Sequence, residues 1–157
     1  VLTMAGKKLR IAIVGCGGIA NGKHMPSLSM LPEVEMVAFC DIIEERAVKA
    51  ADQYGKKGVK VCTDYREIAS DPKIDVVHVC TPNRSHSVIS VACLEGGKHV
   101  MCEKPMAINT AEAHKMLEAA KKSGKKLTVG YNNRFRADSM YLKQICAEGG
   151  LDRKSVV

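Results

Sequence analysis

The 157-residue sequence contains no tryptophan and few other aromatic residues, with two phenylalanines and four tyrosines. The core must therefore consist mainly of valine, isoleucine, leucine, methionine and alanine, as is usual where helices cover a parallel sheet. Long apolar runs are also missing, and the first apolar run ends after about four residues. We therefore expect no membrane partner and no signal peptide.

The seven cysteines are odd in number and form no Cys-x-x-Cys pair, which argues against a disulfide framework. Most of them lie within apolar segments. We therefore expect buried thiols in a reducing compartment and a cytoplasmic protein, and we expect no metal site.

The net charge is +7, from 24 lysines and arginines against 17 acidic residues, and lysines gather at 7–8, 56–60 and 121–126. Each of these clusters adjoins a glycine or a turn, which favours solvated loops. A nucleic-acid surface would place basic residues along one element with stacking aromatics between them. We therefore expect no nucleic-acid partner.

A glycine-rich turn follows the first apolar segment. Residues 11–14 are all apolar and too few for a helix, which suits a strand buried on both faces. Gly15, Gly17, Gly18 and Ala20 then give Gly-x-Gly-x-x-Ala, a form of the dinucleotide-binding fingerprint. The small residues allow a tight turn, close approach of a pyrophosphate, and close packing of helix on strand. A plain strand-to-helix turn is the alternative for this motif alone.

An acidic residue strengthens the dinucleotide interpretation. The apolar segment 34–40 ends at Asp41, about 20 residues after the glycines, where a carboxylate would bind ribose hydroxyls. Residues 17–23 also match Gly-x-x-x-x-Gly-Lys, the skeleton of a P-loop. His24 replaces the Ser or Thr that would bind magnesium, so a nucleoside triphosphatase is disfavoured.

Strands and helices alternate along the rest of the chain. We expect strands at 34–40, 59–62, 75–80, 99–102 and 127–130, and helices at 19–31 (interrupted by Pro26), 44–54, 64–69, 87–95, 109–123 and 137–148. In the last helix we expect Tyr141, Leu142 and Ile145 to face inward. The alternation predicts an α/β fold, a doubly wound parallel sheet of the Rossmann type with ligands at the carboxyl ends of its strands.

Four segments at those strand ends carry a family resemblance. They are Gly15-Cys-Gly-Gly-Ile-Ala20, Cys80-Thr-Pro-Asn83 with His86, Glu103-Lys-Pro105, and Gly130-Tyr-Asn-Asn-Arg-Phe135. Together, over residues 9 to 150, they resemble the Gfo/Idh/MocA oxidoreductases, which use NAD or NADP to oxidise or reduce sugars, polyols and related alcohols.

The resemblance implies roles for particular residues. The expected cofactor-binding residues are Gly15, Gly17, Gly18, Ile19, Asp41, Thr81, Pro82, Asn83, His86, Glu103, Lys104, Asn133 and Arg134. Lys104 is the expected catalytic residue, because its ammonium could stabilise charge on the carbinol oxygen during hydride transfer. A surface lysine is the alternative for Lys104, and a surface ion pair for Arg134. His78 is expected to be a packing residue and His114 a surface residue, whereas the sequence suggests no role for His24.

The family's second, α+β substrate domain is not expected in this chain. We expect residues 1–8 to be a tail or a cloning remnant, 9–150 the NAD(P)-binding domain, and 151–157 the start of a truncated C-terminal domain. The sequence contains no Asp-x-x-x-His pair and no Tyr-x-x-x-Lys pair of a short-chain dehydrogenase. The expected partner of the full-length protein is a sugar or polyol, and homo-oligomers are expected only with the missing domain. A non-catalytic dinucleotide-sensing module is the alternative function.

Two finer expectations complete the sequence interpretation. Asp41 should favour NAD, because a carboxylate repels the 2′-phosphate of NADP and Ile42 and Ile43 supply no cation. The Lys104–Pro105 peptide bond is expected to be cis, on the family resemblance and the sharp turn at that strand end.

Overall fold

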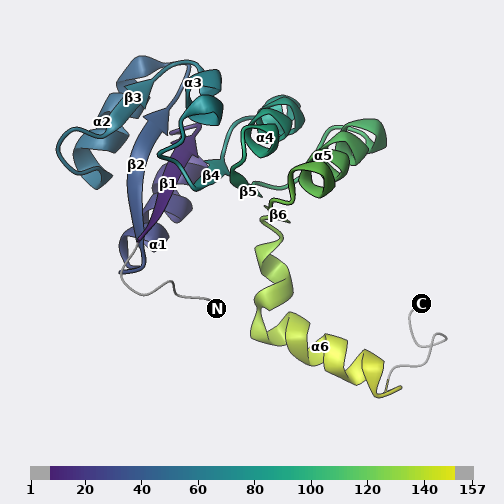
Figure 1. The fold of residues 1–157 in the computed structure, drawn as a ribbon. Helices are drawn as coiled ribbons and strands as arrows, with labels where there is room; N and C mark the ends of the chain where they lie inside the picture. The colour runs from purple at the N-terminus through teal and green to yellow at the C-terminus, as the bar shows by residue number, and fades with distance from the viewer. Residues whose placement is uncertain (1–7, 151–157) are drawn as a thin grey trace.

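The computed structural model describes residues 8–150, so the tail expected at 1–8, apart from Lys8, and the start of a second domain expected at 151–157 lie outside the described residues. A six-stranded parallel sheet organises this part of the chain (Figure 1). Its strands are Leu9–Val14 (β1), Val34–Cys40 (β2), Lys60–Cys62 (β3), Val76–Val79 (β4), His99–Cys102 (β5) and Leu127–Val129 (β6). The order β3-β2-β1-β4-β5-β6 runs outward in both directions from β1, which confirms the doubly wound sheet.

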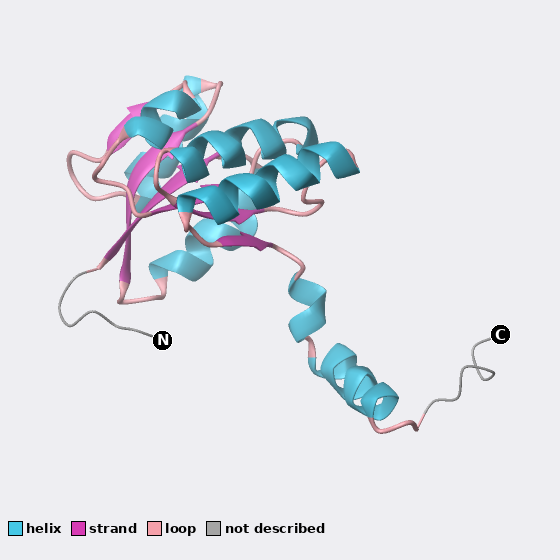
Figure 2. Ribbon diagram, turned by 45° about the vertical axis from the view of Figure 1, so that its right-hand side comes forward, coloured by secondary structure: helices cyan, strands magenta, loops and turns pink. Residues whose placement is uncertain are grey.

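Helices cover both faces of the sheet. The described helices are Met25–Ser29 (α1), Glu44–Tyr54 (α2), Tyr65–Ser70 (α3), His86–Glu95 (α4), Thr110–Ser123 (α5) and Ala137–Ala147 (α6), with a π-helical turn at Ala20–His24 (η1) and 3-10 turns at Asn83–Ser85 (η2) and Asn132–Phe135 (η3); α6 does not cover the sheet. One core cluster lies under α3, α4 and α5, and the other under η1, α1 and α2. Figure 2 shows α4 and α5 side by side over one face.

The register between β1 and β2 shifts by one residue. Ile11 pairs with Met36, but Ala12 pairs with Ala38, so Val37 is an extra residue in β2. Val37 and Ala38 consequently both pack on the α3–α5 side of the sheet. Such a bulge reverses the side-chain alternation of every residue that follows it in the strand.

The helix expected at 19–31 is divided at the proline, as the sequence indicates. The chain passes from the π-helical turn η1 into α1 at Met25, and Pro26 lies in the first turn of α1. A proline has no amide hydrogen for the i→i−4 bond, and it is tolerated best in a first helical turn. Ala20, the first residue of η1, is completely buried, as expected for the small residue that ends the glycine motif.

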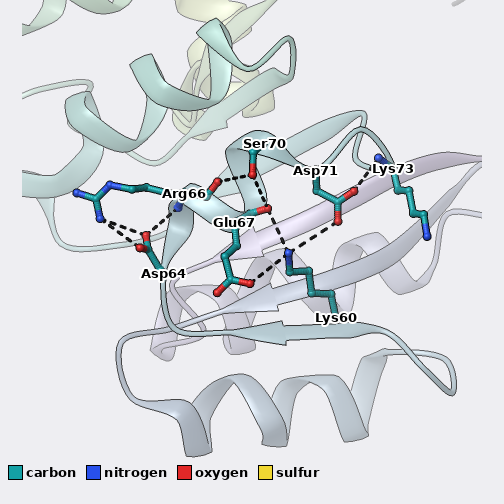
Figure 3. Close-up of polar contacts among 7 residues, drawn as sticks. All are labelled: Lys60, Asp64, Arg66, Glu67, Ser70, Asp71 and Lys73. Carbon is teal, nitrogen blue, oxygen red and sulfur yellow. Dashed lines mark hydrogen bonds and ion pairs between the residues drawn. The ribbon is translucent and has the colours of Figure 1, made fainter.

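Polar contacts fix α3 to the edge strand β3 (Figure 3). The side chain of Asp64 caps α3 by accepting a 2.9 Å hydrogen bond from the Arg66 amide. Lys60 of β3 donates to the carbonyl oxygen of Glu67 at 3.3 Å and forms ion pairs with the carboxylates of Glu67 and Asp71. Edge strand and helix are therefore joined by charge as well as by packing.

The prediction that α6 buries an apolar face is wrong. Tyr141 is 64% exposed and Leu142 is 55% exposed, and Ile145 is only half-buried. Figures 1 and 2 show the reason, because α6 extends away from the sheet and no other described helix covers it. Among residues 8–150, no helix is both long enough and apolar enough to cross a membrane.

Candidate cofactor-binding site

The glycine loop after β1 forms the floor of the candidate site. Gly15 has a φ of +92°, and a Cβ atom there would lie 2.7 Å from the carbonyl carbon of Cys80 at the end of β4. Only glycine satisfies both conditions. Gly17 and Gly18 instead border open space, since a Cβ atom at either position would meet no other atom within 4 Å. The loop is thus closed toward β4 and open at the next two glycines.

Asp41 connects the end of β2 to this loop. The residue is buried, and one of its carboxylate oxygens accepts a 2.8 Å hydrogen bond from the amide of Cys16. The other oxygen accepts a 2.9 Å bond from the amide of Ile43. Each carboxylate oxygen has a second lone pair, so both can still accept a bond from a ligand.

A pocket of about 430 Å³ lies between these strand ends. Gly15, Gly17 and Gly18 line it together with Asp41. Thr81 also lines it, and its Oγ1 is fully buried with no hydrogen-bond partner within residues 8–150. A buried hydroxyl without a partner is costly unless a ligand supplies one, and the open glycines leave space for a phosphate group. The residues present therefore fit a dinucleotide.

Part of the expected site lines this pocket. Of the expected cofactor-binding residues, Gly15, Gly17, Gly18, Asp41, Thr81 and Pro82 do so. The pocket lining does not include Ile19, Asn83, His86, Glu103, Lys104, Asn133 or Arg134. Asn133 and Arg134 are exposed in η3, which follows β6, and their predicted role stays a prediction.

His86 joins two loops instead of lining the pocket. Its Nδ1 lies 2.7 Å from the carbonyl oxygen of Pro105, and its Nε2 lies 2.8 Å from that of Thr81. The residue is 1% exposed. It therefore sets the position of the Thr81 loop relative to the turn after β5.

Glu103 and Lys104 lie at the end of β5. The amide of Glu103 donates to the carbonyl oxygen of Val79, and the carboxylate accepts a 3.0 Å bond from the amide of Lys104. Its other oxygen lies 2.8 Å from Nε2 of His24. The Lys104–Pro105 bond is cis, which confirms that prediction. Lys104 itself is exposed.

Residues that the sequence reasoning missed also line the pocket. They include Arg46 in the first turn of α2, Tyr65 in the first turn of α3, and Arg84 in η2. The expectation that no cation stands beside Asp41 considered only Ile42 and Ile43. The signal was present, because a helix that begins just after a strand end places its first turn beside that strand end.

The expectation of buried thiols is confirmed for six cysteines, whereas Cys146 of α6 is exposed. All seven are free. Burial raises the pKa of the Cys16 thiol to about 12 and also raises the pKa values of Cys40 and Cys80, which line the pocket. These thiols are therefore neutral apolar contacts. No group of three or more His, Cys, Asp or Glu residues within 8–150 is arranged to hold a metal ion.

The parallel doubly wound sheet, with its glycine loop and carboxylate at the switch point, defines a dinucleotide-binding domain of the Rossmann type. Residues 9–131 match the family model described as "Oxidoreductase family, NAD-binding Rossmann fold", the Gfo/Idh/MocA family. The chain belongs to this family of NAD-binding oxidoreductases.

Relatives of the chain are dehydrogenases. D-glucoside 3-dehydrogenase of Escherichia coli is 36% identical over 148 residues, which cover 94% of this chain and 42% of the relative. Myo-inositol 2-dehydrogenase of Thermotoga maritima is 32% identical, with 95% and 44% covered. The WlbA dehydrogenase of Chromobacterium violaceum, solved with NADH and UDP-GlcNAcA, superposes with a TM-score of 0.84 at 32% identity, covering 94% of this chain and 42% of that one. The chain thus spans less than half the length of these relatives.

Proposed function

We propose that residues 9–150 bind NAD across the carboxyl ends of β1, β2 and β4. The observation that carries the proposal is the pocket lined by the open glycines, by Asp41 and by Thr81, whose hydroxyl has no hydrogen-bond partner among the described residues. In this arrangement Gly17 and Gly18 receive the pyrophosphate and Asp41 accepts hydrogen bonds from the adenosine ribose. Thr81 donates its hydroxyl proton to the bound dinucleotide.

We further propose that the whole protein oxidises or reduces an alcohol group of a sugar or polyol. The names of the relatives support this substrate class. When bound, NAD would accept the hydride from the alcohol carbon. Lys104, at the end of β5, then places an ammonium group where charge develops on the carbinol oxygen. The hydrogen bond from its amide to Glu103 holds the backbone that carries it.

A cytoplasmic location is the third part of the proposal. It is supported by the seven free thiols, since such cysteines persist in reducing compartments. The proposed partner is a small-molecule substrate, and self-association is proposed only for the whole protein.

The proposal is tested by calorimetric titration of the 157-residue chain with NADH. We expect saturable binding, and we expect Thr81→Val to weaken it by roughly 3- to 10-fold, because one hydrogen bond of about 0.5–1.5 kcal/mol is lost. Thr128→Val is the matched control, since Thr128 is an exposed residue of β6 outside the pocket lining. Absence of NADH binding at millimolar concentration, or equal effects of the two variants, would contradict the proposal.

A further inference from the structure

Two histidines and a glutamate form a hydrogen-bonded chain beside Lys104. Nε2 of His24 lies 2.8 Å from a carboxylate oxygen of Glu103, and Nδ1 of His24 lies 3.1 Å from Nδ1 of His78. The two rings meet edge to face with their centroids 5.3 Å apart. His24 comes from η1 and His78 from β4, while Glu103 follows β5. Three separate elements therefore contribute to one linear arrangement.

The chemistry of the contacts restricts where protons lie. An ionised carboxylate only accepts hydrogen bonds, so the Nε2 atom of His24 must carry a proton. Between the two Nδ1 atoms, one must donate and the other accept. If His24 is neutral, the proton between the rings belongs to Nδ1 of His78. If His24 is an imidazolium, that proton belongs to His24, and His78 carries its own proton on Nε2.

We propose that His24 and His78 are positioning residues that take up and release one proton behind Glu103 through a change of tautomer at His78, with both hydrogen bonds retained. On uptake, a proton from water binds Nε2 of His78 and the Nδ1 proton of His78 moves to Nδ1 of His24. The pair gains one proton and one positive charge, which is placed on His24 next to Glu103. Release reverses both transfers.

The surroundings of His78 suit this role. Burial, together with the charge of His24, lowers the pKa of His78 to about 4, so His78 stays neutral near pH 7 in either tautomer. The residue is nevertheless only half-buried, and Nε2 makes no hydrogen bond among the described residues. In that part of the chain, Thr81 Oγ1 and Ser90 Oγ are the fully buried side-chain atoms without partners. Nε2 of His78 is therefore not completely shielded from solvent.

The other titratable groups near the chain do not compete for the proton. The thiols of Cys80 and Cys102 interact electrostatically with Glu103, and burial raises the pKa of both, that of Cys102 to about 11. Both thiols are thus neutral. Lys23, next to His24, and Lys104, next to Glu103, are both exposed. The negative charge that faces His24 is that of Glu103.

The consequence concerns the backbone of Lys104. Protonation of His24 strengthens its bond to Glu103, because both partners are then charged. The second carboxylate oxygen of Glu103 accepts the amide proton of Lys104 in both states of His24. The pair therefore keeps Lys104 in place through a change of pH. This inference rests on the proposed function only in giving Lys104 its role beside the nicotinamide.

Long-range ¹H–¹⁵N NMR of the histidine side chains in the ¹⁵N-labelled 157-residue chain tests the proposal directly. Over a pH titration, we expect a step in which His24 becomes doubly protonated. In the same step His78 should change from the Nδ1–H to the Nε2–H tautomer. A His78 that keeps one tautomer throughout, or that becomes doubly protonated with His24, overturns the proposal.

Variants separate proton uptake from mere packing. His24→Gln keeps a donor for Glu103 but cannot hold a proton, so the Lys104 amide resonance should be retained and the tautomer change at His78 lost. Glu103→Gln removes the charge and should move that change to lower pH. His114→Gln, in the exposed part of α5, should alter neither signal. A tautomer change that persists in His24→Gln overturns the proposal.

These measurements need no cofactor, so they are independent of the NADH titration. Tautomer exchange without NADH binding would contradict the proposed function and leave this inference intact. NADH binding with a fixed tautomer at His78 would support the proposed function and overturn this inference.

Discussion

The carboxylate of Asp41 accepts a hydrogen bond of 2.8 Å from the amide of Cys16, inside the glycine loop. The residue predicted to bind ribose thus also holds the end of β2 against the turn that would receive the pyrophosphate. The ribose contact and the phosphate-binding turn therefore both depend on the buried Asp41 carboxylate. Substitution of Asp41 should consequently affect stability as well as cofactor choice.

The wild-type chain should bind NAD more tightly than NADP, because the Asp41 carboxylate repels a 2′-phosphate. Asp41→Asn keeps one acceptor oxygen and should reduce the preference. Arg46 also lines the pocket, and its positive charge attracts the 2′-phosphate that Asp41 repels. Arg46→Ala should therefore weaken NADP binding more than NAD binding. Calorimetric titration of both cofactors at moderate salt measures each ratio, and tighter NADP binding by the wild type would contradict the prediction.

Gly15→Ala should lower the stability of the domain, whereas Gly17→Ala should weaken NADH binding with little change in stability. At Gly15 a methyl group meets the carbonyl group of Cys80 and the backbone is left-handed, so we expect a loss of about 3 kcal/mol in the free energy of unfolding. At Gly17 nothing lies within 4 Å, so stability should change by less than about 0.5 kcal/mol while NADH binding weakens. Urea unfolding and NADH titration of both variants check the pair. Equal loss of stability in the two would show that the loop conformation is different.

His86→Leu should destabilise the domain by about 2 kcal/mol, because the buried ring between the carbonyl oxygens of Pro105 and Thr81 is lost and at least one of them loses its N–H donor. His114→Leu, at an exposed position, serves as the control and should change stability by less than about 0.5 kcal/mol. Urea denaturation gives both values. A small effect at His86 would mean that water replaces the imidazole between the two loops.

Stability should fall at alkaline pH because of the buried thiols. Burial raises the pKa of Cys93 to about 12, above the value of about 8.5 for an exposed thiol. The unfolded chain therefore loses this proton at a lower pH than the folded chain. The contribution of the buried thiol to the free energy of unfolding is fully present below about pH 8.5 and is lost as pH rises toward 12. For each such thiol the loss reaches about 1.4 kcal/mol per pH unit. Urea unfolding from pH 8 to pH 10.5 should show a shallower decline for Cys93→Ala than for the wild type, and no such change for Cys146→Ala.

The 157-residue chain alone should bind dinucleotide but oxidise no alcohol. Holding a substrate in reactive geometry is worth about 7–11 kcal/mol, and general acid or base catalysis adds roughly 10²–10⁴-fold. The described residues place Lys104 at the end of β5 without a facing wall for substrate. NADH absorbance, followed with NAD and a panel of sugars and polyols, should stay at background. A rate that Lys104→Ala abolishes would contradict this expectation.

The sheet was predictable because its strands are apolar runs with glycines or prolines at their ends. The segments 34–40 and 99–102 match β2 and β5 residue for residue. The helix starts after Asp64 and Asn109 follow from equally local chemistry, since both side chains accept hydrogen bonds from amides in the first turns. Local chemistry decides these features, so a single sequence contains them.

Features that depend on tertiary packing were not predictable. The apolar residues of α6 indicate a buried face, but burial also needs a neighbouring element, which the helical pattern cannot specify. In the same way, His24 and His78 are 54 positions apart, and only the pairing of β1 with β4 brings their rings together.

The extra residue Val37 in β2 determines which way the end of that strand faces. From Ala38 onward every side chain occupies the side opposite to the one that uninterrupted alternation would give, and Asp41 follows three residues later. A deletion of one residue between 34 and 38 would leave the strand just as apolar. Loss of Val37 would remove the bulge but keep Ala38 opposite Ala12, so Phe39, Cys40 and Asp41 would stay on their present sides. Loss of a residue after Ala38 would instead exchange the sides of those that follow and turn the Asp41 carboxylate from the glycine loop. We therefore expect homologous chains to keep the number of residues between Ala38 and Asp41.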